Sequence, residues 1–305
     1  MYNIIEVKNL TKQYGDTVAV NGISFGVEKG EVFGILGPNG AGKTTTLEMI
    51  EGLRKPDGGS IFINGIDALK EADRIKEIIG VQLQATSIYD DIRVNEAVAL
   101  FGSYYKKSIA SRQVLAEVSL IDKSHSRVNA LSGGQKQRLN IGLALVNDPE
   151  VLFLDEPTTG LDPQARHNIW SIVERLRDRS KTIILTTHYI EEAEQLCGRV
   201  AIIDRGKIIA VNSPGDLINN AGLDTSIEFS TAQELNGLSQ NLPEIRKIAN
   251  GATNKYTINT KAVSRVLRDI TNLCYENNVE LENISVRKTT LEDVFLAMTG
   301  RKLRE

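Results

Sequence analysis

The apolar and polar positions follow one pattern over residues 2–215 and another over the rest of the chain. In the first region, short β-rich runs alternate with helical stretches and with turns marked by glycine. This alternation predicts a mainly parallel sheet with helices on both faces. The unbroken apolar runs Val151–Leu154 and Ile183–Leu185 have the length of strands buried in the centre of such a sheet.

The opening part of this region is dense in strand-like runs, which predicts an additional small antiparallel sheet. These runs are Ile4–Leu10, Val18–Val20, Ile23–Val27 and Val32–Leu36. Residues 90–130 are rich in helix formers, so we expect a helical insert at about residues 85–145. We therefore expect an α/β domain over residues 1–215.

A second, smaller α+β domain is expected over residues 216–305. A turn cluster at Asn212–Gly215 interrupts the first pattern, and Asp216–Asn220 follows as a short helix. The order βαββαβ is then predicted, with helices on one face of an antiparallel sheet. Its elements are the strand Ile227–Phe229, the helix Ala232–Leu238, the strands Ile245–Ile248 and Lys255–Ile258, the helix Lys261–Tyr275 and the strand Leu281–Val286.

Composition narrows the classes of protein to consider. A net charge of -3 argues against a nucleic-acid binder held by phosphate contacts, so no nucleic-acid partner is expected. No stretch approaches the ~18 uninterrupted apolar residues of a membrane span. Cys197 and Cys274 lie far apart with no second Cys or His beside them, which favours two reduced thiols over a disulfide or metal pair.

The segment Gly37-Pro-Asn-Gly-Ala-Gly-Lys-Thr44 has the P-loop spacing G-x-x-x-x-G-K-[ST]. It follows the apolar run Val32–Leu36 and precedes a helical run over Thr45–Leu53, which is the context that the motif requires. Its backbone N–H groups can turn inward around phosphate at the start of a helix. Lys43 can reach the β- and γ-phosphates, and the Thr44 hydroxyl can bind Mg²⁺. The expected nucleotide-binding residues are Gly37, Pro38, Asn39, Gly40, Ala41, Gly42, Lys43, Thr44 and Thr45.

Two carboxylates follow the apolar run Val151–Leu154. Ligands bind at the carboxyl end of such strands. Asp155 is placed to hold Mg²⁺, and Glu156 can act as general base toward a water that attacks the γ-phosphate. The alternative is a strand end capped by solvated acids, which the P-loop elsewhere in the chain disfavours.

A second phosphate cradle is predicted at Leu131-Ser-Gly-Gly-Gln135, which precedes a helical stretch at Lys136–Val146. A chain with one P-loop does not need a second cradle at a distant place. Two copies arranged head to tail would use both, with each nucleotide between the P-loop of one copy and Ser132, Gly133, Gly134 and Gln135 of the other. At this point residues 2 to about 215 resemble the nucleotide-binding domains of ABC transporters, for which the LSGGQ signature is diagnostic.

The resemblance implies roles for four further residues. Tyr14 would stack on adenine, although a half-buried strand tyrosine is the alternative. Gln84 would contact Mg²⁺ and sense the membrane partner, with Gln82 as the neighbour that could be confused with it. Asp162 would cross the dimer interface, and it also suits an N-cap followed by Pro163. His188 would contact the γ-phosphate, while His125 and His167 are expected to be surface or packing residues and Trp170 a packing residue.

The tail, Thr290–Gly300, is similar to the closing segment of ATPases that serve drug-resistance exporters of the daunorubicin type. Leu291, Val294, Phe295 and Met298 fall at helical spacing and are expected to face a core. The resemblance implies an ATPase that binds ATP and Mg²⁺, works as a homodimer or with a similar ATPase, and powers export through separate integral membrane subunits.

Such a subunit would sit at the cytoplasmic face of the cell membrane. Two alternatives stay open from the sequence: a non-transport ABC ATPase and a nucleotide-dependent switch without turnover. The two intact residues Glu156 and His188 argue against the switch.

Overall fold

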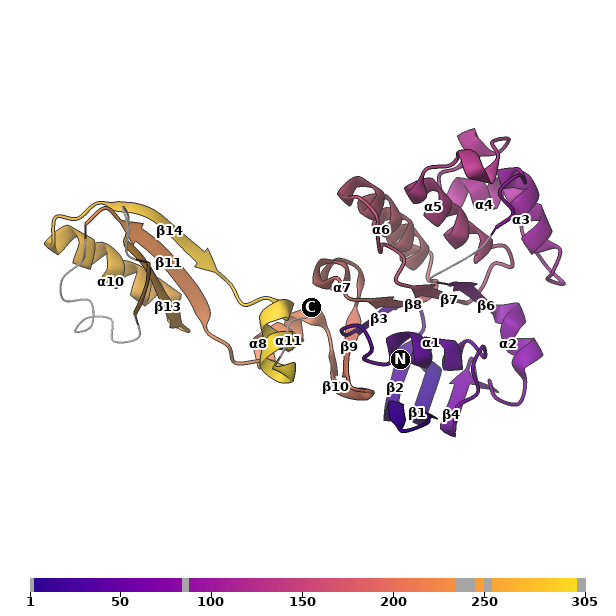
Figure 1. The fold of residues 1–305 in the computed structure, drawn as a ribbon, viewed down its shortest axis with the longest axis horizontal. Coiled ribbons are helices and arrows are strands. Elements are labelled where there is room, and N and C mark those ends of the chain that lie inside the picture. Colours follow the sequence, from indigo (N-terminus) through magenta and orange to yellow (C-terminus); the bar gives the residue numbers. More distant parts are fainter. Residues whose placement is uncertain (1–2, 84–87, 234–244, 250–253, 301–305) are drawn as a thin grey trace. The chain divides into compact units, whose positions relative to one another are not determined.

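The computed structural model describes residues 3–83, 88–233, 245–249 and 254–300. The chain divides into two compact units. The first unit contains the chain up to Pro214 and the chain from Met298 onward, and the second unit is Gly215–Ala297. Figure 1 shows the fold of each unit.

A six-stranded sheet with the order β10-β9-β3-β8-β7-β6 forms the centre of the first unit. All neighbours pair in parallel except β9 and β10, which form an antiparallel hairpin. The strands are β3 (Val32–Leu36), β6 (Ile79–Gln82), β7 (Val151–Asp155), β8 (Thr182–Thr187), β9 (Arg199–Asp204) and β10 (Lys207–Asn212). Every residue of β3, β7 and β8 is buried, as the continuous apolar runs predict for strands covered on both faces.

The three central strands end side by side. Leu36 of β3 pairs with Thr187 of β8, and Thr186 pairs with Asp155 of β7. Because parallel strands present their carboxyl ends at one edge, the segments that follow β3, β7 and β8 meet there. This register positions the site described below.

A four-stranded sheet with the order β2-β1-β4-β5 packs against this core. It consists of β1 (Asn3–Tyr14), β2 (Thr17–Glu28), β4 (Gly58–Ile63) and β5 (Ile66–Asp67), and all its pairs are antiparallel. The two runs expected at Val18–Val20 and Ile23–Val27 are one continuous strand, β2. One apolar cluster joins both sheets, and the rings of Phe25 and Phe33 stack in it with centroids 5.3 Å apart.

The helices of the first unit are α1 (Lys43–Ile50), α2 (Ala72–Ile78), α3 (Val94–Gly102), α4 (Ser111–Glu117), α5 (Gly133–Leu143), α6 (Pro163–Asp178) and α7 (Ile190–Leu196), with short 3₁₀ turns at Ile121–Lys123 and Val128–Ala130. Helices α3, α4 and α5 lie together in Figure 1. The sequence placed the start of α5 at Lys136, but the helix begins at Gly133. The reason is that Ser132 caps it, so Gly133 and Gly134 belong to its first turn.

The second unit contains a four-stranded antiparallel sheet with the order β12-β13-β11-β14. The elements from Pro214 onward are α8 (Pro214–Asn220), β11 (Thr225–Thr231), β12 (Arg246–Ala249), β13 (Asn254–Thr260), α10 (Val263–Glu276), β14 (Leu281–Arg287) and α11 (Leu291–Thr299). Ile227 and Phe229 of β11 pack in one cluster with Val266 and Ile270 of α10. Most of the helix expected at Ala232–Leu238 lies outside the described residues.

One expectation for the tail is wrong. Leu291, Val294 and Phe295 are buried as their helical spacing predicts, but the side chain of Met298 is 41% exposed. Met298 lies on the same stripe of α11 but in its last turn, since the helix ends at Thr299. Helical spacing shows on which side of a helix a residue lies, but it does not show how many turns of that side are covered by other residues.

Cys197 and Cys274 are both free and buried. Among the described helices, none combines the length and the apolar character that a membrane crossing would need.

Candidate active site

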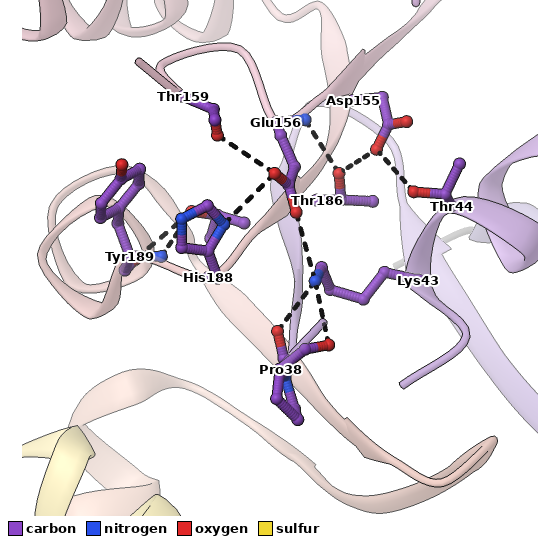
Figure 2. A network of polar contacts seen from close by, with 11 residues as sticks. Pro38, Lys43, Thr44, Asp155, Glu156, Thr159, Thr186, His188 and Tyr189 are labelled. Carbon is purple, nitrogen blue, oxygen red and sulfur yellow. Dashed lines mark hydrogen bonds and ion pairs between the residues drawn. The ribbon is translucent and has the colours of Figure 1, made fainter. Parts of the chain in front are cut away.

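Three chain segments that follow adjacent strands meet at one edge of the central sheet, and Figure 2 shows their side chains. The P-loop follows β3, Glu156 follows β7, and His188 follows β8. The sequence predicted all three positions, and the structure brings them together.

The P-loop folds tightly against its neighbours. Gly42 has a backbone φ of +102°, and a Cβ atom there would lie 2.4 Å from the carbonyl oxygen of Ala19. A Cβ atom at Gly37 would lie 2.3 Å from the carbonyl oxygen of Ile203. Only glycine fits either position, so the backbone can hold the turn that leads into α1. Asn39 and Gly40 at the loop tip are exposed.

The ammonium group of Lys43 is buried and has three acceptors. Its Nζ atom donates to the carbonyl oxygens of Gly37 at 2.9 Å and Pro38 at 3.2 Å. It also lies 3.2 Å from Oε1 of Glu156. An ammonium group has three N–H donors, so these contacts use all of them. Phosphate binding therefore requires Lys43 to exchange its present partners.

Glu156 is the residue on which the site converges. Its Oε2 atom accepts a hydrogen bond from the Thr159 hydroxyl at 3.1 Å and lies 3.2 Å from Nδ1 of His188. Burial alone would raise the pKa of Glu156, but the charges of Lys43 and His188 outweigh it and hold the pKa below its usual value. The carboxyl group is therefore ionised at neutral pH and able to accept a proton.

The backbone of Glu156 is strained as well. Its φ of +45° lies in the left-handed region, which a glutamate rarely adopts. The Glu156 amide donates to the Thr186 hydroxyl at 2.9 Å, which fixes the peptide at the turn. Strain of this kind costs about 1–3 kcal/mol and accompanies residues that are held in place for function.

Asp155 lies beside the P-loop helix. Its Oδ1 atom accepts hydrogen bonds from the Thr186 hydroxyl and, at 3.4 Å, from the Thr44 hydroxyl. Burial raises the pKa of Asp155, and the Thr186 hydrogen bond partly offsets this. A hydroxyl and a carboxylate at this spacing offer hard oxygen ligands.

His188 is partly exposed, and its ring lies against that of Tyr189 with centroids 4.2 Å apart. The contact between Nδ1 and Glu156 lacks hydrogen-bond geometry within the described residues. It becomes an ion pair only when the imidazole is protonated.

The signature residues lie at a different hollow. A cavity of about 310 Å³ is lined by both the first turn of α5 and the first turn of α6. Its lining residues include Ser132, Gly133, Gly134, Gln135 and Asp162. Ser132 caps α5 by accepting from the Gln135 amide at 3.3 Å, and Asp162 caps α6 by accepting from the Ala165 amide at 2.8 Å. Two helix N-termini at one hollow favour an anion there.

Two other expected residues are less central. The Tyr14 ring is 40% exposed and has Arg54 at 5.4 Å and Lys12 at 5.6 Å over it. Gln84 lies outside the described residues, so its expected role has no structural description here. The neighbouring Gln82 is buried at the end of β6, where its amide donates to the carbonyl oxygen of Leu83 at 2.6 Å.

Three residues of the site were missed from the sequence: Thr159, Thr186 and Glu51. Thr186 is the polar residue that joins Asp155 to the Glu156 backbone, and its signal was a threonine pair at the end of an otherwise apolar strand. Glu51, directly after α1, is 5% exposed, and burial followed by the charge of Asp155 raises its pKa to about 8. Nothing in the local sequence distinguishes Glu51 from an ordinary surface glutamate.

Comparison with known proteins places the chain in a family. Residues 20–159 match the family model described as ABC transporter. The chain is 40% identical over 313 residues to the Nod factor export ATP-binding protein I of Burkholderia orbicola (strain AU 1054), covering 99% of this chain and 98% of that protein. It is 37% identical over 323 residues to the linearmycin resistance ATP-binding protein LnrL of Bacillus subtilis (strain 168), covering 99% and 100%.

A solved ATP-binding cassette, MJ0796, is similar in structure and was captured as a dimer in a post-hydrolysis state with ADP and Pi. The TM-score is 0.62 with 27% identity, and the match covers 68% of this chain and 98% of that one. These full-length relatives, together with the P-loop fold, show that the chain belongs to the ABC family and is the ATP-binding, ATP-hydrolysing subunit of an exporter-type ABC transporter.

Proposed function

We propose that Lys43, Thr44, Asp155, Glu156 and His188 form the catalytic centre of this ATPase, with Glu156 as the general base. One observation carries the proposal: Lys43 and His188 approach opposite oxygens of the same carboxylate, each at 3.2 Å. The three residues lie in the segments that follow three adjacent strands. Their convergence therefore comes from the sheet register and not from one flexible loop.

Each residue has a task in hydrolysis. Lys43 leaves the Gly37 and Pro38 carbonyl oxygens and binds the β- and γ-phosphates within the cradle of residues 37–45. Glu156 accepts a proton from the attacking water through a carboxylate oxygen, for which its lowered pKa suits it. His188 holds the γ-phosphate, and Tyr14 stacks on the adenine.

The residues around Thr44 fit a magnesium ion. Mg²⁺ is commonly bound through one or two protein oxygens together with substrate phosphates and water, and not by a cage of side chains. Thr44 and Asp155 supply such oxygens, and the described residues contain no cluster of three His, Cys, Asp or Glu that would indicate another kind of site. Gln84 is proposed to contribute as well. When bound, the ion neutralises charge on the β- and γ-phosphates.

The hollow between α5 and α6 is proposed to serve a second copy of the chain, or a similar ATPase. In a head-to-tail dimer, Ser132, Gly133, Gly134, Gln135 and Asp162 of one copy would face the nucleotide held by the P-loop of the other. The lining of the hollow includes none of the P-loop residues of its own chain, which supports use by a partner. Loss of the γ-phosphate would remove charge from this interface and let the dimer open.

Separate membrane subunits complete the proposed assembly. The chain would act at the cytoplasmic face of the cell membrane through them, and they would select the cargo. The ATP-binding domain is proposed to be residues 1–215, with the insert at about 85–145, and residues 216–305 form the accessory domain.

The experiment that tests the proposal compares ATP hydrolysis by the wild type and by Glu156→Gln, with the mass of the species followed on addition of ATP. We expect turnover to fall by about 10²–10⁴ in the variant while an ATP-bound dimer accumulates. Turnover in the variant equal to that of the wild type would remove Glu156 as the base. A wild type that binds ATP and neither hydrolyses it nor dimerises would refute the head-to-tail arrangement.

A further inference from the structure

Glu192 is a buried carboxylate that the proposed mechanism does not use. It lies in the first turn of α7 and is 0% exposed. Burying a carboxyl group costs several kcal/mol unless it is well partnered. Its partners therefore indicate what it does in this position.

The contacts of Glu192 come from three separate segments. Oε1 accepts a hydrogen bond from Nε1 of Trp170 on α6 at 3.2 Å. Burial raises the pKa of Glu192, and the nearby hydroxyls of Thr187 and Thr158 and the Trp170 indole oppose that rise. The charge of Arg166 on α6 opposes it too. The carboxyl group is thus bonded to α6 and lies near polar groups of β8 and of the segment after β7.

Each of these segments leads directly to the site. Thr187 precedes His188, and its hydroxyl accepts from the Tyr189 amide at 2.9 Å, so it fixes the backbone on both sides of the histidine. Thr158 is two residues beyond Glu156. Trp170 lies on the helix that Asp162 caps at the second hollow.

The network also has unused hydrogen-bonding capacity. Within the described chain, neither Oε2 of Glu192 nor Oγ1 of Thr158 completes a hydrogen bond of normal geometry, although both are buried. A buried donor or acceptor that makes no hydrogen bond costs free energy, because it has lost its bonds to water. Thr158 lies two residues beyond Glu156, so this buried donor and acceptor couple the surroundings of Glu192 to the segment that carries Glu156.

We propose that Glu192 is a positioning residue for ATP hydrolysis, which holds His188 and the segment after Glu156 in a fixed relation to α6. It acts through those residues and touches no reacting atom. The inference rests on the roles proposed for Glu156 and His188. It adds that the carboxyl group of Glu192 transmits the nucleotide state of the site to the helix that begins at Asp162.

The chain contains one tryptophan, and it is the residue bonded to Glu192. The fluorescence of Trp170 in the full-length protein is therefore a direct reporter of this contact. We expect its emission to differ between ADP and ATP, with ATP held unhydrolysed by the Glu156→Gln background. Adding Glu192→Ala to that background is expected to abolish the difference. Equal nucleotide-dependent emission with and without Glu192 would overturn the proposal.

Kinetics provide the second measurement. Because misplacing a catalytic group by about 1 Å can cost on the order of 10²-fold, we expect Glu192→Ala to lower kcat by about 10–100-fold. The KM for ATP should change by less than about threefold, since the P-loop is untouched. Glu191→Gln, an exposed neighbour on α7, is the matched control and should leave both constants unchanged. A higher KM for ATP with an unchanged kcat would contradict a positioning role.

Two more variants keep the test decisive. If Glu192→Ala does not fold, Trp170→Phe keeps an aromatic ring at this position and removes the N–H donor together with the five-membered ring of the indole, and a fall in kcat of about 3–10-fold is expected. Wild-type kcat in a folded Trp170→Phe variant would then refute the inference.

Glu156→Gln and His188→Ala separate the two proposals. Wild-type turnover in these two variants would refute the proposed catalytic centre itself. Loss there with full turnover in Glu192→Ala would remove only the role of Glu192.

Discussion

Gly134 on α5 approaches Ala165 on α6 so closely that a Cβ atom on the glycine would lie 2.9 Å from the Cβ of the alanine. A methyl group at Gly134 must therefore push the first turns of the two helices apart. Gly134→Ala is expected to lower the stability of the nucleotide-free protein by about 1–3 kcal/mol, because overpacking cannot relax against a Cβ atom. Thermal unfolding without nucleotide measures this.

Gly133, the preceding residue, provides the control. A Cβ atom there meets no atom within 4 Å, and its φ is not positive. Gly133→Ala should leave stability unchanged or raise it by up to about 1 kcal/mol, since alanine favours a helix over glycine. Equal losses in the two variants would mean that the contact with Ala165 is not the cause.

The ion pair between Lys43 and Glu156 predicts that removing the charge of Glu156 tightens ATP binding. In the wild type, ATP must separate the pair and bring its γ-phosphate near a carboxylate. Glu156→Gln avoids both costs, so its affinity for ATP should rise by about 3–30-fold. Calorimetric titration with ATP and Mg²⁺ measures the change.

Thr159→Ala tests whether charge is the reason. It deletes another partner of Glu156, the hydroxyl at 3.1 Å, without changing the charge of the carboxylate. Its affinity for ATP should stay near the wild-type value. Unchanged or weaker binding by Glu156→Gln would show that the ion pair does not limit nucleotide entry.

Asp162 has a structural task that can be separated from its proposed place at a dimer interface. Its Oδ1 atom accepts from the Ala165 amide at 2.8 Å and caps α6. Asp162→Ala should lower stability by about 1 kcal/mol, whereas Asp162→Asn, which also caps helices well, should retain it. Denaturant unfolding compares the two, and ATP-dependent dimerisation is measured beside it. If the Asp162→Asn variant is as stable as the wild type but does not dimerise with ATP, the negative charge of Asp162 is what the interface requires.

The buried Glu51 predicts a specific pH dependence of stability in the nucleotide-free protein. Its pKa is about 8 in the fold, against the ordinary value of 4.5 for a glutamate. Between these values the folded state retains a proton that the unfolded state has released, so this residue makes stability fall as the pH rises from about 4.5 to 8. Glu51→Gln removes the dependence and should raise the unfolding temperature at pH 8 more than at pH 5. Glu191→Gln, an exposed glutamate, should show no such difference.

The sequence predicted the strand ends and the residues that follow them because both depend on local patterns. An unbroken apolar run such as Val151–Leu154 can only be a buried strand or helix, and its length favours a strand. The residues after it then lie at the carboxyl edge. Glu156 was found in this way, since parallel strands leave little freedom in where their ends point, whereas His188 was found through the family resemblance.

What the sequence could not predict depends on contacts between distant segments. The cap on α5 was missed because the serine and glutamine that form it, Ser132 and Gln135, belong to a signature that also suits a loop. Thr186 bonds the Glu156 amide 30 positions away, and Glu192 bonds Trp170 22 positions away, so no period in the chain marks either residue. The left-handed turn at Glu156 was equally invisible, because its cause is the packing around it.

The three acceptors around the Lys43 ammonium group also limit which anions the protein accepts. A cation whose donors are all satisfied in a buried setting gains little from a single weak anion. Only a ligand that also fills the backbone cradle of the P-loop recovers the cost of breaking those contacts. The empty subunit should thus bind nucleoside polyphosphates in preference to free orthophosphate or sulfate, so that orthophosphate released by hydrolysis does not compete with ATP for the site.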